Sequence, residues 1–116
     1  MNDVERTERA RSMGSLVLRS ERRGDSHVIA LLGELDLDGA PRLEAEFLRV
    51  EASDATTIVV DLGNLDFIDS TGIRLILMAA DRSQDDGRFK LLRGPKQVHR
   101  VFEITNLVDR LPFADT

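Results

Sequence analysis

Short apolar runs alternate with amphipathic stretches along this chain, and the alternation predicts strands and helices in turn. The runs 16–18 and 28–32 predict two strands that form a hairpin across the polar segment 21–25. Two later runs, 57–62 and 89–92, predict single strands. The β-branched composition of 57–62 is typical of a strand covered on both faces.

Between the strands, residues that can face a core recur at the spacing of a helix. The first set follows Asp38, which we expect to be a helix N-cap, and this helix ends at 53–54. The third helix opens at 94–95 and ends at Asn106, a residue suited to a left-handed C-cap. The three inward faces are Leu43, Phe47 and Val50; Ile73, Ile76, Leu77 and Ala80; and Val98, Val101, Phe102 and Thr105.

The resulting order is β-β-α-β-α-β-α, and residues 111–113 are a candidate for a last edge strand. Strands that alternate with helices are joined by crossovers, which give a largely parallel sheet. The sequence therefore predicts a single α/β domain over residues 14–116. We expect a mostly parallel central sheet of four to five strands, an N-terminal hairpin, and helices covering the sheet. Residues 1–13 are charged and lack apolar periodicity, so we expect a flexible extension there.

Composition narrows the classes of function. The 116 residues carry 16 basic and 21 acidic side chains, a net charge of −5, which disfavours direct binding to nucleic acid. The chain has no cysteine, no spacing typical of metal ligands and no glycine loop for a phosphate cofactor. No apolar run is long enough to span a membrane, and the start of the chain does not read as a secretory signal. We expect a cytoplasmic domain without metal or cofactor.

The most informative segment is 58–78, which runs from an apolar strand through a tight acidic turn into a helix that opens on Ser70. Position alone predicts that Ser70 is an N-cap, worth about 1 kcal/mol. Two features point beyond capping. Gly72 lacks a side chain in the first turn, which would let another molecule approach the serine. Asp66 and Asp69 supply more carboxylate than capping requires.

The same helix is apolar beyond its inward face. Leu75 and Met78 lie off the stripe made by the inward residues. A second covered surface would explain them, and it could belong either to a partner or to another part of this domain.

Residues 65–77, LDFIDSTGIRLIL, resemble the signature of the STAS domain, as found in bacterial anti-sigma factor antagonists. In that signature an acidic residue precedes the phosphorylated serine, and a Ser or Thr, a Gly and an aliphatic residue follow. The segment 33–36 is similar to the family's turn after its second strand, and 59–62 to the strand before the switch. The resemblance covers residues 14–113.

Carried over residue by residue, Ser70 matches the phosphorylated serine and Asp69 the acidic residue before it. Asp36 matches the acidic residue of the neighbouring loop, and Thr71 a secondary hydroxyl. Arg74 departs from the pattern, because the family commonly has Gly there. The partner-binding surface implied by the resemblance and the apolar pattern comprises Asp36, Asp66, Asp69, Ser70, Thr71, Gly72, Arg74, Leu75 and Met78.

The resemblance also implies a mechanism in which this chain is regulatory and not an enzyme. The unphosphorylated form would bind an anti-sigma factor and so free a sigma factor. That anti-sigma factor would also be the serine kinase, of the histidine-kinase-like ATPase type, and a PP2C-type serine phosphatase would reverse the change. The alternative within the family is a STAS module of another signalling system, such as a stress-signalling scaffold component or a small-ligand sensor.

Two other classes fit less well. A receiver domain with Asp61 as the acceptor of a phosphoryl group would need an acidic pair after the first strand, and the segment 19–21 does not supply one. A serine hydrolase would need a base near Ser70. The two histidines, His27 and His99, are expected in a strand and a helix, and there is no Gly-x-Ser-x-Gly motif.

Overall fold

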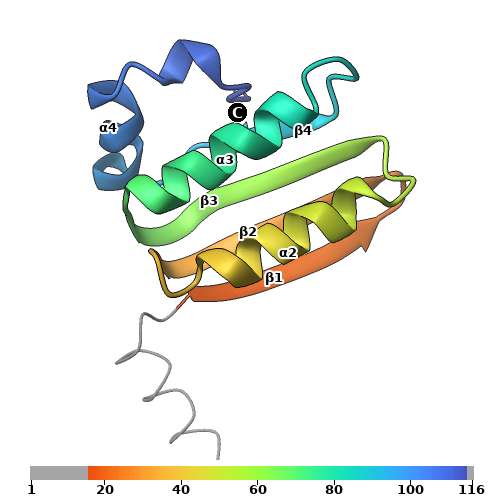
Figure 1. The fold of residues 1–116 in the computed structure, drawn as a ribbon, viewed down its shortest axis with the longest axis horizontal. Coiled ribbons are helices and arrows are strands. Elements are labelled where there is room, and N and C mark those ends of the chain that lie inside the picture. Colours follow the sequence, from red (N-terminus) through yellow and green to blue (C-terminus); the bar gives the residue numbers. More distant parts are fainter. Residues whose placement is uncertain (1–15, 115–116) are drawn as a thin grey trace, which may run out of the picture.

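The computed structural model describes residues 16–114, and within them it confirms the predicted order of elements (Figure 1). The flexible extension expected at residues 1–13 lies outside the described residues. The elements are β1 (Leu16–Arg23), β2 (Ser26–Leu35), α2 (Ala40–Glu51), β3 (Thr57–Ile68), α3 (Ser70–Arg82), β4 (Phe89–Leu92), α4 (Lys96–Ile104) and the 3₁₀ turn η1 (Val108–Arg110).

The four strands form one sheet in the order β1-β2-β3-β4. β1 pairs antiparallel with β2 across a tight turn at Gly24, whose φ of 60° suits the first central position of such a turn. β2, β3 and β4 are parallel. Both crossovers lead in the same direction across the sheet, and right-handed crossovers of that kind place their helices on one face. Figure 1 shows α2 and α3 side by side on that face.

The core lies between this face of the sheet and the two helices. Paired positions on neighbouring strands share a face, and Ile29, Val60 and Leu91 form such a row, each fully buried. The predicted inward stripe of α2 is confirmed, because Leu43, Phe47 and Val50 are buried. In the first half of β3, the positions that alternate with the buried residues are only half-buried. This strand therefore has one buried face and one half-buried face. The expectation that 57–62 is covered on both faces is therefore wrong.

β3 is longer than predicted, because the expected acidic turn after residue 62 is part of the strand. Pairing with β2 continues to Leu35 and Ile68, with register shifts after Ala30 and after Gly33. At each shift β3 contributes one residue more than β2, as in a β-bulge. The extra residues change the spacing of the buried positions from two to three, giving Ile58, Val60, Leu62, Leu65 and Ile68.

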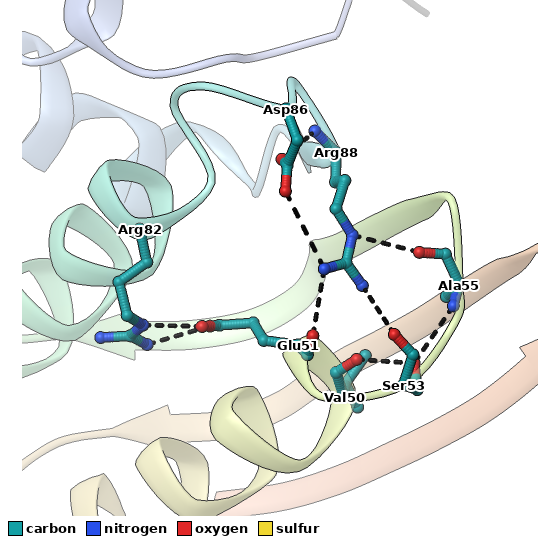
Figure 2. A network of polar contacts seen from close by, with 7 residues as sticks. All are labelled: Val50, Glu51, Ser53, Ala55, Arg82, Asp86 and Arg88. Atoms are coloured by element: carbon teal, nitrogen blue, oxygen red, sulfur yellow. Dashed lines mark hydrogen bonds and ion pairs between the residues drawn. The ribbon is translucent and has the colours of Figure 1, made fainter.

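At the end of the sheet away from these bulges, two arginines join α2, α3 and the start of β4 (Figure 2). The Arg88 guanidinium donates to the backbone carbonyls of Glu51, Ser53 and Ala55 at 3.0, 3.3 and 3.1 Å. Arg82 of α3 makes a two-point contact with the Glu51 carboxylate at 2.7 and 3.0 Å. These contacts hold the end of α2 against α3 and the start of β4.

α4 follows β4 and packs against β3. The left-handed C-cap predicted at Asn106 is confirmed by its φ of 60°. Its N–H donates to the Glu103 carbonyl, and the N–H of Leu107 donates to the Phe102 carbonyl, the pair of bonds of a Schellman motif. The last edge strand is reduced to one parallel bridge between Leu91 and Phe113.

Candidate functional site

The carboxyl ends of β2 and β3 meet at one edge of the sheet, and each is followed by an acidic residue. Leu35 pairs with Ile68, and the N–H of Asp69 donates to the Leu35 carbonyl at 3.1 Å. Asp36 directly follows Leu35. The fold therefore brings Asp36 to the same edge as Asp69 and Ser70, although more than thirty residues separate them in sequence.

Asp69, and not Ser70, is the N-cap of α3. Its backbone is extended, and its Oδ1 accepts hydrogen bonds from the N–H groups of Thr71 and Gly72 at 2.9 and 3.1 Å. The expectation that Ser70 caps the helix is wrong. Asp and Ser are about equally good caps. Asp69 takes the role here because it is the first residue after the end of β3.

Ser70 is consequently the first residue of α3 and is exposed. The capping bonds use Asp69, so they leave the serine hydroxyl available for other chemistry. Ser70 also sits at the positive end of a thirteen-residue helix, where a negative group is favoured. An exposed hydroxyl at this place suits an acceptor of phosphate.

Gly72 serves packing inside the domain. A Cβ at this position would lie 2.6 Å from Cγ of Leu35 and 3.0 Å from Cγ1 of Ile68. Gly72 is buried, so its lack of a side chain lets the first turn of α3 lie against the ends of β2 and β3. The expectation that Gly72 lets another molecule approach Ser70 is therefore wrong, because the space beside Gly72 is filled by Leu35 and Ile68.

The loop between β2 and α2 is shaped by Asp36. Its Oδ1 accepts the N–H of Asp38 at 3.1 Å, and its carbonyl accepts the N–H groups of Gly39 and Ala40. Asp38 was expected to cap α2, but Gly39 occupies the cap position without a side-chain bond. Asp36 is half-buried and holds the loop that faces the start of α3.

A groove of about 260 Å³ runs between α2 and α3 beside this edge. Thr71, Arg74 and Met78 line it from α3, and Met78 is 40% exposed. Leu75 lines it too but belongs to the core, so packing within the domain explains its position off the helical stripe. The remaining lining comes from Leu37, Ala40, Pro41 and Glu44.

Two exposed apolar residues near the site were missed at the level of sequence. Leu37, between two aspartates, is 70% exposed, and Phe67 is 47% exposed. Asp66 is the unpaired extra residue of the second bulge, since Gly33 pairs with Leu65 and the next residue of β2 pairs with Phe67. An apolar residue flanked by acids in a loop was the available signal for Leu37.

Two of the groups invoked by the other two classes, Asp61 and His27, are engaged elsewhere. Asp61 Oδ1 accepts the N–H of Gly63 at 2.8 Å, so it stabilises the first bulge. His27 is buried near the start of β2, where its Nε2 lies 2.6 Å from Oγ of Ser20. Burial, followed by Arg49, lowers the pKa of His27.

Two general features of the described residues complete the description. Between residues 16 and 114, no three histidine or acidic side chains gather in a way that could hold a metal ion. No helix in that part of the chain is long and apolar enough to cross a membrane.

Known proteins share both this sequence pattern and this fold. A family model described as "Mlab, STAS domain" matches residues 18–112. BtrV of Bordetella bronchiseptica, whose name assigns it provisionally to the anti-sigma factor antagonists, is 34% identical over 94 residues. That alignment covers 79% of this chain and 81% of BtrV.

Solved structures extend the likeness. An anti-sigma factor antagonist from Mycobacterium paratuberculosis has a TM-score of 0.80 at 24% identity, covering 88% of this chain and 87% of its own, and shows the shared fold. The anti-sigma factor antagonist SpoIIAA, 26% identical, is solved unphosphorylated, with a TM-score of 0.71 over 85% of this chain and 89% of its own. The phosphorylated form of SpoIIAA from Bacillus gives 0.65, covering 85% and 92%.

Proposed function

The chain belongs to the STAS domain family, and from this membership and the geometry of its site we propose that it is an anti-sigma factor antagonist switched by phosphorylation of Ser70. In its unphosphorylated form it binds an anti-sigma factor and thereby frees a sigma factor. The observation that carries the proposal is the exposed hydroxyl of Ser70 at the first position of α3, where Asp69 already supplies the cap.

The surface beside Ser70 suits a protein partner. The groove between α2 and α3 offers apolar side chains at Leu37 and Met78, and Thr71 and Arg74 add polar contacts at its rim. Asp36 and Asp66 add negative charge near the paired ends of β2 and β3. This combination of an apolar centre and a charged rim is typical of an interface between proteins. We assign the partner surface to these residues together with Asp69 and Ser70. Gly72 and Leu75, which were also expected on this surface, are buried and support it from beneath by packing.

Phosphorylation would block binding through local charge. A phosphoserine adds about −1.5 to −2 charges next to the carboxylates of Asp36, Asp66 and Asp69. A partner that accommodates the hydroxyl then faces a bulky, strongly hydrated anion. Loss of about 3 kcal/mol of binding free energy is enough to weaken the complex roughly a hundredfold.

The chemistry of the switch belongs to other proteins in this proposal. The anti-sigma factor is itself a serine kinase of the histidine-kinase-like ATPase type, and a PP2C-type serine phosphatase removes the phosphate. In this proposal the chain is their substrate and its own role is regulatory, as the names of the similar anti-sigma factor antagonists suggest.

The proposal is tested by two measurements on one set of variants. Wild type, Ser70→Ala and Thr71→Val are incubated with ATP and a lysate of the organism that carries the gene, and phosphorylated residues are located by mass spectrometry. Ser70→Ala is expected to lose the phosphate, and Thr71→Val to keep it.

The second measurement compares partners captured by Ser70→Ala and Ser70→Asp. We expect Ser70→Ala to retain an ATPase of the histidine-kinase-like type and Ser70→Asp to lose it. Equal capture of that ATPase by both variants would contradict the switch. Capture of a multi-protein signalling scaffold in place of the ATPase would favour the alternative of another STAS signalling system.

A further inference from the structure

A second cavity, of about 480 Å³, lies at the start of α4, away from the groove between α2 and α3. Three of its lining residues are cations and one is an acid, in a chain whose net charge is −5. Positive charge is therefore gathered here against the overall balance of the molecule. The lining residues are Arg93, Gly94, Lys96, His99, Arg100 and Glu103.

The start of α4 lacks the groups that normally stabilise the positive end of a helix. Its N-cap is Pro95, which makes no side-chain cap bond, and its first turn contains no acidic residue. The first helical position is Lys96, which adds a cation where the helix dipole is already positive. This arrangement is unfavourable for the isolated domain, whereas α3 has Asp69 at the corresponding place.

The wall of the cavity includes a buried histidine with an unsatisfied ring nitrogen. His99 is 5% exposed, and its Nδ1 has no hydrogen-bond partner. Burial, followed by the charge of Arg93, lowers the pKa of His99, and Glu103 opposes this change. The ring is held edge-on to Phe113 at a centroid distance of 5.0 Å. A buried polar atom without a hydrogen-bond partner calls for an explanation, and this one belongs to a residue that lines the cationic cavity.

We propose that this cavity binds the phosphate group of a small anionic ligand, with Arg93, Lys96 and Arg100 as the cationic contacts and the first N–H groups of α4 as further donors. Arginine side chains and helix N-termini are the groups that proteins use most for phosphate. The volume exceeds that of a bare phosphate and leaves room for the group attached to it. This site lies outside the proposed switch and does not depend on it.

The proposal is tested by titrating the full chain with inorganic pyrophosphate and with ADP, followed by NMR chemical shifts. The expected result is saturable binding with chemical-shift changes centred on residues 93–100. Added salt should weaken this binding. Arg93→Ala/Arg100→Ala is expected to weaken binding about tenfold or more, because each arginine supplies charge-assisted hydrogen bonds. Arg19→Ala/Arg23→Ala removes the same charge from β1 and is expected to bind like wild type.

Gln97→Glu is a second variant, in which weaker binding cannot be explained by loss of folding. A carboxylate in the first turn of α4 is expected to raise the melting temperature, because it compensates the helix dipole. The same carboxylate is expected to weaken pyrophosphate binding by occupying the positive end. The pKa of His99 should rise on binding in wild type, since an anion favours the charged ring.

Several results would overturn the proposal: no saturation with pyrophosphate or ADP, equal loss of binding in the β1 control, or shifts centred on the start of α3. Binding of a polyglutamate peptide without binding of either phosphate compound would overturn it as well. Vesicles containing phosphatidic acid distinguish the source of the phosphate. Binding to them that Arg93→Ala/Arg100→Ala abolishes would support the site and identify a lipid headgroup as its ligand.

Discussion

At the scale of single residues, the start of α3 separates two roles that the sequence places next to each other. Asp69 holds the helix and Ser70 presents a hydroxyl. The sequence could identify Ser70 as the important residue, because its neighbours form a distinctive motif. It could not decide which residue is the cap, because both types cap helices well and the position of the strand end settles the matter.

Asp69 is expected to contribute to folding stability through its two cap bonds. Asp69→Ala should lower the free energy of unfolding by about 1 kcal/mol, and Asp69→Asn should restore most of it, since Asn also caps well. Ser70→Ala should change stability by less than about 0.5 kcal/mol, as expected for an exposed side chain outside the cap. Urea denaturation of the three variants checks this, and a larger loss in Ser70→Ala than in Asp69→Ala would contradict the assignment.

Gly72 should tolerate no larger residue without cost. In Gly72→Ala the new methyl group would lie 2.6 Å from Cγ of Leu35, so the helix start must shift away from β2. We expect a loss of about 1–3 kcal/mol in the free energy of unfolding from overpacking. Thermal and urea unfolding measure the loss. Stabilisation, as helix propensity alone would give, would show that the contact with Leu35 relaxes without penalty.

At the scale of elements, β3 shows where the pattern of hydrophobic residues was insufficient to predict the full length of a strand. The first half of the strand has apolar residues at every second position, and the sequence predicted it. In the second half the buried positions Leu62, Leu65 and Ile68 are three apart, because each interval contains a bulge. Apolar residues three positions apart, with glycine and acidic residues between them, are also typical of a turn. Only the pairing with β2 shows that this segment is a strand and not a turn.

The end of α2 is stabilised by Arg88 in a way that no local pattern revealed. Arg88→Ala would leave three backbone carbonyls without their donor, and we expect a loss of about 2–3 kcal/mol in the free energy of unfolding. Arg82→Ala removes an ion pair with Glu51 that lies nearer the surface and should cost less than about 1 kcal/mol. Urea midpoints of both variants test the order.

Lysine offers a further comparison at the same position. Arg88→Lys keeps the charge but has no planar fork, so it should recover only part of the stability. Because these contacts lie at the opposite end of the sheet from Ser70, none of the variants should change phosphorylation of the folded protein. An Arg88→Lys variant as stable as wild type would show that charge alone is sufficient.

At the scale of the whole molecule, buried histidines make stability depend on pH. Burial is the main cause that lowers the pKa of both His27 and His99 in the folded chain. The unfolded chain, where histidine titrates near about 6.5, then binds more protons below that pH. The free energy of unfolding should therefore fall as the pH is lowered below about 6.5.

A second decline is expected at more acidic pH. The hydrogen bond from Arg49 is the main cause that lowers the pKa of Glu46, so its contribution to stability is present above the unfolded value and is lost as the pH falls below it. Urea denaturation between pH 8 and pH 4 measures both steps. In His27→Gln/His99→Gln the first step should disappear, and a first step of equal size in this variant would contradict its assignment to the histidines.

The sequence by itself determined the order of strands and helices, the inward stripe of α2, the left-handed end of α4 and the prominence of Ser70. These depend on local periodicity and on residue types with narrow conformational preferences. The tertiary structure alone decided that Asp69 caps α3, that Gly72 makes room for Leu35, and that Asp36 lies at the same edge as Ser70. These facts depend on which strand ends meet and on how closely distant segments pack, and neither is encoded in the spacing of neighbouring residues.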